Sequence, residues 1–147
     1  MRKIAVIGIV MIAALFIPAR AADQLFQPGS LIIPMDTTFQ DSGMLASYGL
    51  VYELLRNGVE VDWTIEPGKA YGGVDFTASA TDVRSSAIIA AHGYSGGPFV
   101  IDASHSAQAL PIVGTWQNAH AQVKVHQSTV PFTAAVARLE SPFSVPK

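Results

Sequence analysis

Short apolar runs alternate with amphipathic stretches along the chain, and this order limits the possible folds more than any other feature. The run Leu31-Ile32-Ile33 predicts a buried strand. Residues 43–57 repeat apolar side chains at helical spacing, which predicts a helix with one apolar stripe. Residues 59–65 then alternate between apolar and polar side chains, as a half-exposed strand does. The apolar stripe of the helix consists of Met44, Tyr48, Val51, Tyr52 and Leu55.

The remaining segments extend the same order. They predict strands at 87–91, 98–101 and 123–126 and helices within 104–118 and at 132–139. A strand–helix–strand order is typical of an α/β domain whose crossovers are right-handed. We therefore predict a small, mostly parallel sheet with flanking helices, in flavodoxin-like layering. Residues 143–145 resemble the start of one more strand, so we expect the sheet to be incomplete at the C-terminus, as in a fragment of a longer protein.

The first 21 residues have the three parts of a secretory signal peptide. Arg2 and Lys3 are followed by an apolar run at 4–17 and by Ala19-Arg20-Ala21, which has small residues where signal peptidase needs them. The apolar run is shorter than the roughly 20 residues that a membrane-spanning helix needs. We predict a signal peptide at 1–21, a single domain at 22–147 and a secreted or periplasmic location, with no stable membrane span after cleavage.

Composition and charge exclude several classes of protein. Half of the residues are hydrophobic and 14% are charged, which is too apolar for an intrinsically disordered chain. The chain has no cysteine, so it is neither a disulfide-stapled protein nor an iron–sulfur protein. Without Arg2, Lys3 and Arg20, six basic residues remain against eleven acidic ones, a net charge of −5. This charge argues against nucleic acid as a partner.

The segment Gly93-Tyr94-Ser95-Gly96-Gly97 fits the Gly-x-Ser-x-Gly pattern of many esterases. In those enzymes the serine lies on a sharp turn from a strand into a helix. The residues after Ser95 are typical of a strand, so we interpret the segment as a glycine-rich connection between two strands. A small serine hydrolase using Ser95, Asp102 and His126 stays as the alternative. The trypsin-like order His, Asp, Ser is not available, because the only earlier histidine is His92.

Polar residues follow two of the predicted strands. In open α/β sheets, ligands bind beyond the carboxyl ends of the strands. If the strands are parallel, the two polar clusters share one edge and form a ligand site for a cation, a sugar hydroxyl or an amine. The competing interpretation is that these residues cap helices. The candidates are Asp36, Thr37, Thr38 and Asp41 after the first strand and Asp102, Ser104 and His105 after the second.

The histidines do not indicate a metal site. His92, His105, His120 and His126 are separated by 13, 15 and 6 residues, and none of these spacings matches a pair of ligands on one helix or hairpin. We predict no metal and no cofactor.

The segment Leu-Ile-Ile-Pro-Met-Asp, followed by Tyr-Gly-Leu-Val-Tyr-Glu-Leu-Leu-Arg-Asn-Gly-Val-Glu-Val-Asp-Trp, is similar to the openings of flavodoxin-like and class I glutamine-amidotransferase-like domains. It also looks like the N-terminal part of longer uncharacterised exported bacterial proteins. The resemblance covers roughly the first 45 residues after the signal peptide and implies a strand, a helix and a strand. Amidotransferase activity needs a nucleophilic cysteine, which this chain lacks, and residues 35–42 contain no glycine for a phosphate-binding loop.

These observations favour an exported, non-catalytic binding or structural module of the cell envelope or surface. Its partner would be a small molecule or an envelope protein.

Overall fold

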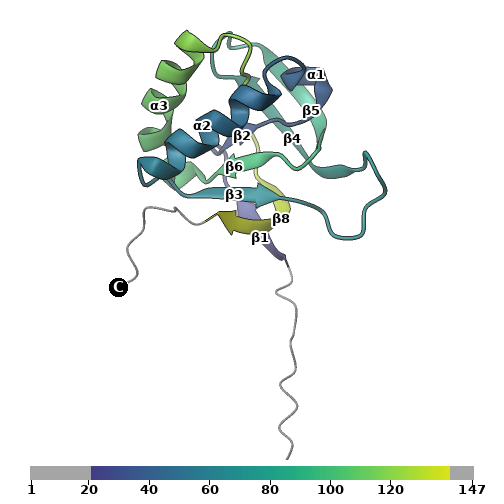
Figure 1. Cartoon of the computed structure of the whole chain (residues 1–147). Helices are drawn as coiled ribbons and strands as arrows, with labels where there is room; N and C mark the ends of the chain where they lie inside the picture. The colour runs from purple at the N-terminus through teal and green to yellow at the C-terminus, as the bar shows by residue number, and fades with distance from the viewer. Residues whose placement is uncertain (1–20, 140–147) are drawn as a thin grey trace, which may run out of the picture.

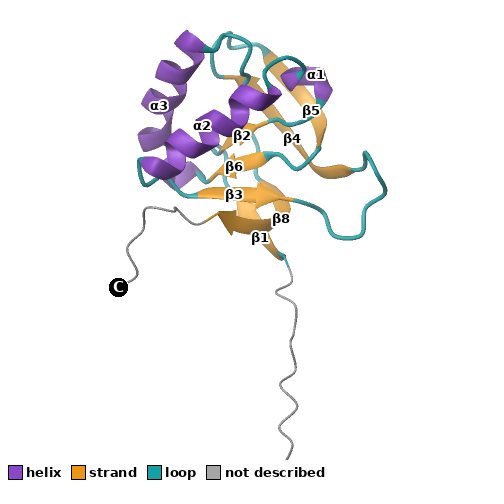
Figure 2. Ribbon diagram, viewed as in Figure 1, coloured by secondary structure: helices purple, strands orange, loops and turns teal. Residues whose placement is uncertain are grey.

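The computed structural model describes residues 21–139 of the protein (Figures 1 and 2). The predicted signal peptide, apart from Ala21, and the predicted final strand at 143–145 lie outside the described residues. No helix in the described part of the chain is both long and apolar enough to cross a membrane.

One sheet of eight strands dominates the described fold, with two longer helices on one of its faces (Figure 2). In chain order the elements are β1 (Ala22–Phe26), β2 (Leu31–Ile33), α1 (Thr37–Gln40), α2 (Met44–Arg56), β3 (Val61–Thr64), β4 (Val74–Asp82), β5 (Ile88–Ser95), β6 (Phe99–Ile101), the 3-10 helix η1 (Ala103–His105), α3 (Ser106–Ala119), β7 (His126–Ser128) and β8 (Phe132–Leu139). In space the strands lie in the order β1-β8-β3-β6-β2-β7-β4-β5.

The predicted mostly parallel α/β fold with flavodoxin-like layering is wrong, because every neighbouring pair of strands in the sheet is antiparallel. The crossover through α2 does join two parallel strands, β2 and β3, but β6 lies between them and runs the other way. The crossover through α3 joins β6 to β7 in the same way, with β2 between them. The two crossovers are interleaved, so no parallel pair of strands is hydrogen-bonded.

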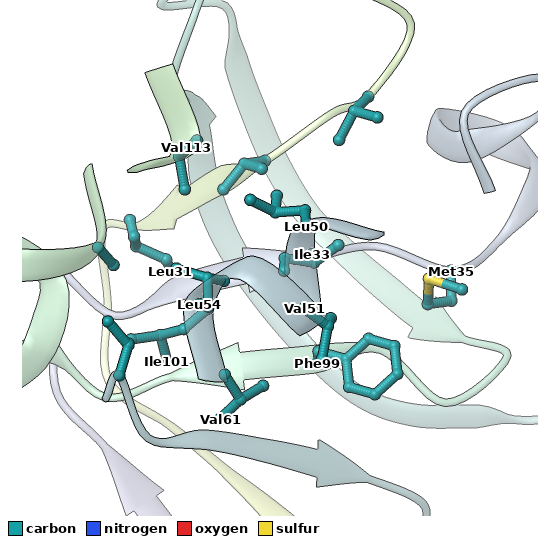
Figure 3. Packing of buried hydrophobic residues seen from close by; sticks show 14 residues of the cluster. Leu31, Ile33, Met35, Leu50, Val51, Leu54, Val61, Phe99, Ile101 and Val113 are labelled. Atoms are coloured by element: carbon teal, nitrogen blue, oxygen red, sulfur yellow. The ribbon is translucent and has the colours of Figure 1, made fainter. Parts of the chain in front are cut away.

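The sheet curls into a half-barrel, and each of its faces has its own core. On the concave face the rings of Phe76 in β4 and Phe132 in β8 stack with centroids 4.6 Å apart, although several strands separate β4 from β8 in the sheet. The other face packs against α2 and α3, where Leu50 and Leu54 of α2 lie on β2 and β6 (Figure 3). Both leucines are fully buried, and each such side chain contributes about 1.5–3 kcal/mol to stability.

Helix α2 confirms the predicted helix but buries a different face. Ser47, Leu50, Val51 and Leu54 are buried, whereas Tyr48 and Tyr52 of the predicted stripe are 53% and 48% exposed. The helix begins after Gly43 without a side-chain cap. Gly58 follows its end with a φ of +75°, a conformation that favours glycine.

One predicted helix is wrong. Residues 132–139 form strand β8 rather than a helix, held between β1 and β3. Strand β1 and most of β4 lie in segments where no element is predicted from the sequence. Pro111 lies inside α3, beyond its first turn, at an exposed position.

Candidate ligand groove

A groove of about 670 Å³ opens at the carboxyl ends of the parallel strands β2 and β3. Three segments line it: residues 35–37 after β2, residues 65–72 between β3 and β4, and residues 95–97 between β5 and β6. We call this space the groove. Its volume is in the range of sites that hold small ligands.

Asp75, the second residue of β4, joins two walls of the groove. Its carboxylate is fully buried. Oδ1 accepts a hydrogen bond from the amide of Glu66 at 2.9 Å and pairs with Nζ of Lys69 at 2.6 Å. Oδ2 accepts from the amide of Gly97 at 2.9 Å. One buried carboxylate therefore fixes the 65–72 wall and the 95–97 wall relative to each other, so the groove is preorganised.

The turn between β5 and β6 is built from two glycines with positive φ, +76° at Gly96 and +74° at Gly97. A side chain at Gly96 would place its Cβ 2.7 Å from the carbonyl oxygen of Met35. The indole Nε1 of Trp63 donates a hydrogen bond to the carbonyl oxygen of Gly97 at 3.0 Å. The turn thus lies directly against the backbone that follows β2.

The substitution Gly96→Ala is expected to lower the free energy of unfolding by about 2 kcal/mol, because it combines a strained left-handed conformation with a backbone clash. Gly58→Ala is the matched control, since Gly58 has nearly the same φ, and a Cβ added there would meet nothing within 4 Å. It should cost only the strain, about 1 kcal/mol. Urea unfolding of both variants measures the difference, and equal losses would contradict the close approach to Met35.

Asp36 lines the groove and also anchors α1. Oδ1 accepts a hydrogen bond from the amide of Thr38 at 3.1 Å, which caps the helix. Oδ2 lies 3.1 Å from Nε2 of His92 on β5. The side chain of Gln40 holds the other end of α1, with hydrogen bonds to both backbone groups of Lys124. The helix-capping interpretation of Asp36 is therefore correct, and the same carboxylate borders the groove.

A cluster of rings joins Phe39 of α1 to His92, Tyr94 and His126, of which Tyr94 and His126 are buried. The ring of Phe39 makes edge contacts with His92 and His126, with centroids 4.7 and 4.5 Å apart. The hydroxyl of Tyr94 lies 2.8 Å from Nδ1 of His126. Burial raises the pKa of Tyr94 above its usual value, so this hydroxyl stays protonated.

Burial also lowers the pKa of His126 to about 4, so this imidazole is neutral near pH 7. Its Nε2 is the buried side-chain polar atom that lacks a hydrogen-bond partner within residues 21–139. His126 borders a small cavity of about 180 Å³ together with Asp82, Ser85 and Lys124. Burial acts to raise the pKa of Asp82, but hydrogen bonds from Ser85 and Arg84 outweigh it and hold that pKa below its usual value.

The two predicted polar clusters do not share an edge, because β2 and β6 are antiparallel. Asp36 and Thr37 line the groove, whereas Thr38 and Asp41 belong to α1 and its C-terminal end and are not among the lining residues. At the opposite end of β6, Asp102 caps η1 by accepting from the amide and hydroxyl of Ser104. His105 lies 3.6 Å from a carboxylate oxygen of Glu60.

The alternative catalytic set is likewise spread out. Ser95 precedes β6 and Asp102 follows it, so the two lie at opposite ends of one strand. His126 is buried and its Nδ1 is engaged by Tyr94. The chain leaves Ser95 through the glycine turn into strand β6, not into a helix. Ser95 instead lines the groove together with Asp36 and Thr37.

Sequence reasoning missed the wall formed by residues 65–72 and the residue that fixes it, Asp75. The signal for this wall was the pair of turns Pro67-Gly68 and Gly72-Gly73, which marks a long excursion between strands. No signal marked Asp75, because its partners are backbone amides distant in the sequence. Within the described residues, no group of three or more metal-ligating side chains is close enough to hold a metal ion.

Compared with models of protein families, with curated proteins and with solved structures, the chain matches none. The resemblance of its opening segment to flavodoxin-like domains is therefore not tested by these comparisons.

Proposed function

We propose that the protein is an exported, non-catalytic binding module of the cell envelope or surface, and that the groove holds a small ligand. The observation that carries this proposal is the preorganised wall: buried Asp75 holds the 65–72 and 95–97 segments with three contacts of 2.6–2.9 Å. Preorganised walls favour binding because little conformational entropy is lost when the ligand enters.

The lining of the groove also supports the proposal. The groove lies beyond the carboxyl ends of β2 and β3, the two strands joined by the α2 crossover. Its lining combines apolar side chains such as Met35 and Ile65 with the polar groups of Thr37 and Ser95. This mixture is typical of small-molecule sites.

The arrangement around Ser95 weighs against a serine hydrolase. A catalytic serine needs a base within hydrogen-bond reach and oxyanion donors beside it. His92 is three residues from Ser95 on the same strand, where alternate side chains point to opposite faces, and its Nε2 faces Asp36. These contacts favour binding over catalysis.

The substitution Ala70→Trp tests the groove as the binding site. Ala70 is exposed and lines the groove, so an indole at this position is expected to fill the space and weaken binding at least tenfold. Ala107→Trp is the matched control, since Ala107 is exposed on α3, outside the groove. Ligand-observed NMR with a panel of small sugars, amino acids, amines and carboxylic acids supplies the measurement. A panel without any binder, or binding that survives Ala70→Trp, would overturn the proposal.

A further inference from the structure

We infer that the ligand of the groove is an organic amine, a protonated ammonium group on a small apolar body; this inference rests on the proposed function. The charges, the apolar surface and the exposed aromatic ring that line the groove favour this class of ligand.

The charges that line the groove are those of Asp36, Glu66 and Lys69. Lys69 is already neutralised, because its Nζ lies 2.6 Å from the buried carboxylate of Asp75 and also donates a hydrogen bond to the carbonyl oxygen of Gly73 at 2.9 Å. Asp36 and Glu66 add two negative charges to the lining, although the side chain of Asp36 is only 8% accessible and its Oδ2 lies against His92. The charges of the lining therefore favour a positively charged ligand.

The carboxylate of Asp36 is held in place for this role. Its two oxygens meet the amide of Thr38 and Nε2 of His92, each at 3.1 Å. Glu66 differs, because its side chain is exposed, and its backbone is fixed by the hydrogen bond to Asp75. Asp36 is therefore a fixed negative charge at the side of the groove, whereas the exposed carboxylate of Glu66 can contact an ammonium group directly.

The rest of the lining fits an apolar body. Met35, Ile65, Pro67 and Ala70 contribute aliphatic surface. Tyr71 also lines the groove, yet its side chain is fully exposed and so makes no contribution to the core. A tyrosine ring beside carboxylates attracts an ammonium group through its negative face. The same negatively charged groups would repel an anion. A neutral alcohol would gain only the apolar contact.

Three probes of similar size and different charge test the inference: phenethylamine, 2-phenylethanol and phenylacetate. Each is titrated into the purified, isotope-labelled protein, and binding is followed through the amide resonances of Gly96 and Gly97 at the groove. We expect phenethylamine to bind at least tenfold more tightly than 2-phenylethanol, and phenylacetate not to bind. Added salt should weaken the binding of phenethylamine and leave the binding of 2-phenylethanol unchanged, because salt screens charge interactions.

The variant Glu66→Gln removes one charge from the lining of the groove without changing the size of the side chain. We expect it to weaken the binding of phenethylamine three- to tenfold. Glu60→Gln is the matched control, because Glu60 lies just before the first residue of β3, at the end of the strand that is remote from the groove. This substitution should leave binding unchanged. Equal affinity for the amine and the alcohol would overturn the inference while leaving the groove a binding site. If none of the probes shifts the two glycines, the inference also fails; the wider panel with Ala70→Trp decides the proposed function separately.

Discussion

Asp75→Ala is expected to lower the free energy of unfolding by about 3 kcal/mol, one of the two largest effects that we predict for this protein. The substitution leaves the amides of Glu66 and Gly97 without their acceptor and separates Lys69 from its counterion. Removing one partner of a buried charge pair typically costs about 3–5 kcal/mol. Lys69 is partly exposed, with 21% of its side chain accessible. Its ammonium group can therefore move into water in the variant, which places the expected loss at the lower end of this range.

Urea unfolding of the purified variant measures this loss. Asp75→Asn keeps an oxygen acceptor but not the charge, so an intermediate loss is expected. Asp23→Ala is the matched control, because Asp23 is an exposed residue of β1, where such a change stays within about 0.5 kcal/mol. A loss below about 1 kcal/mol for Asp75→Ala would show that the 65–72 wall does not depend on this carboxylate.

Local periodicity was sufficient to place several elements. The run Leu31-Ile32-Ile33 is strand β2, the helical spacing in 43–57 is α2, and the alternation in 59–65 is β3. Each of these segments carries its signal in side chains that are neighbours in sequence. The exposed tyrosines of α2 show the limit of this reasoning, since Tyr48 has an apolar body yet faces solvent.

The direction of strand pairing could not be predicted in the same way. The helix crossovers do join parallel strands, as the strand–helix–strand order implies. What changes the fold is the insertion of β6 between β2 and β3, a contact between segments distant in the sequence. Nothing in either segment taken alone specifies that neighbour. The two predicted polar clusters were therefore assigned to one edge, although antiparallel pairing places them at opposite edges.

Strand β8 shows how pairing overrides local preference. The segment Phe-Thr-Ala-Ala-Val-Ala-Arg-Leu contains alanine at three positions, and alanine is the strongest helix former. In the fold Ala134 and Ala135 are both buried, and β8 is hydrogen-bonded to β1 on one side and β3 on the other. Strand preference depends on such surroundings more than on the residue itself.

Several residues of the candidate site were predicted from the sequence, but only the fold shows that they line the same groove. Asp36, Thr37 and Ser95 were each selected from the sequence, but for two separate hypotheses, a polar rim and a catalytic serine. They line one groove because the turn after Ser95 lies against the backbone of Met35. Asp75 was not selected, because its function depends on amides nine and 22 residues away in the chain.

Lowering the pH from 7.5 to 5 is expected to remove about 2 kcal/mol of stability through His126 alone. Burial is the main cause that lowers its pKa from 6.5 to about 4. Asp82 and Asp36 act to raise this pKa, while His92 and Lys124 act to lower it. Below pH 6.5 the imidazole binds a proton in the unfolded chain but stays neutral in the native state, so stability is lost as the pH falls. The loss approaches about 3 kcal/mol near pH 4, where both states become protonated.

The variant His126→Gln tests this assignment, because glutamine does not titrate and its side-chain amide can form a hydrogen bond with the hydroxyl of Tyr94. Its free energy of unfolding should fall between pH 7.5 and 5 by about 2 kcal/mol less than that of the wild-type protein. Equal losses in the wild type and His126→Gln would mean that His126 accepts a proton in the native state. The unpartnered Nε2 would then be a site that the fold keeps accessible to protons, not a neutral part of the core.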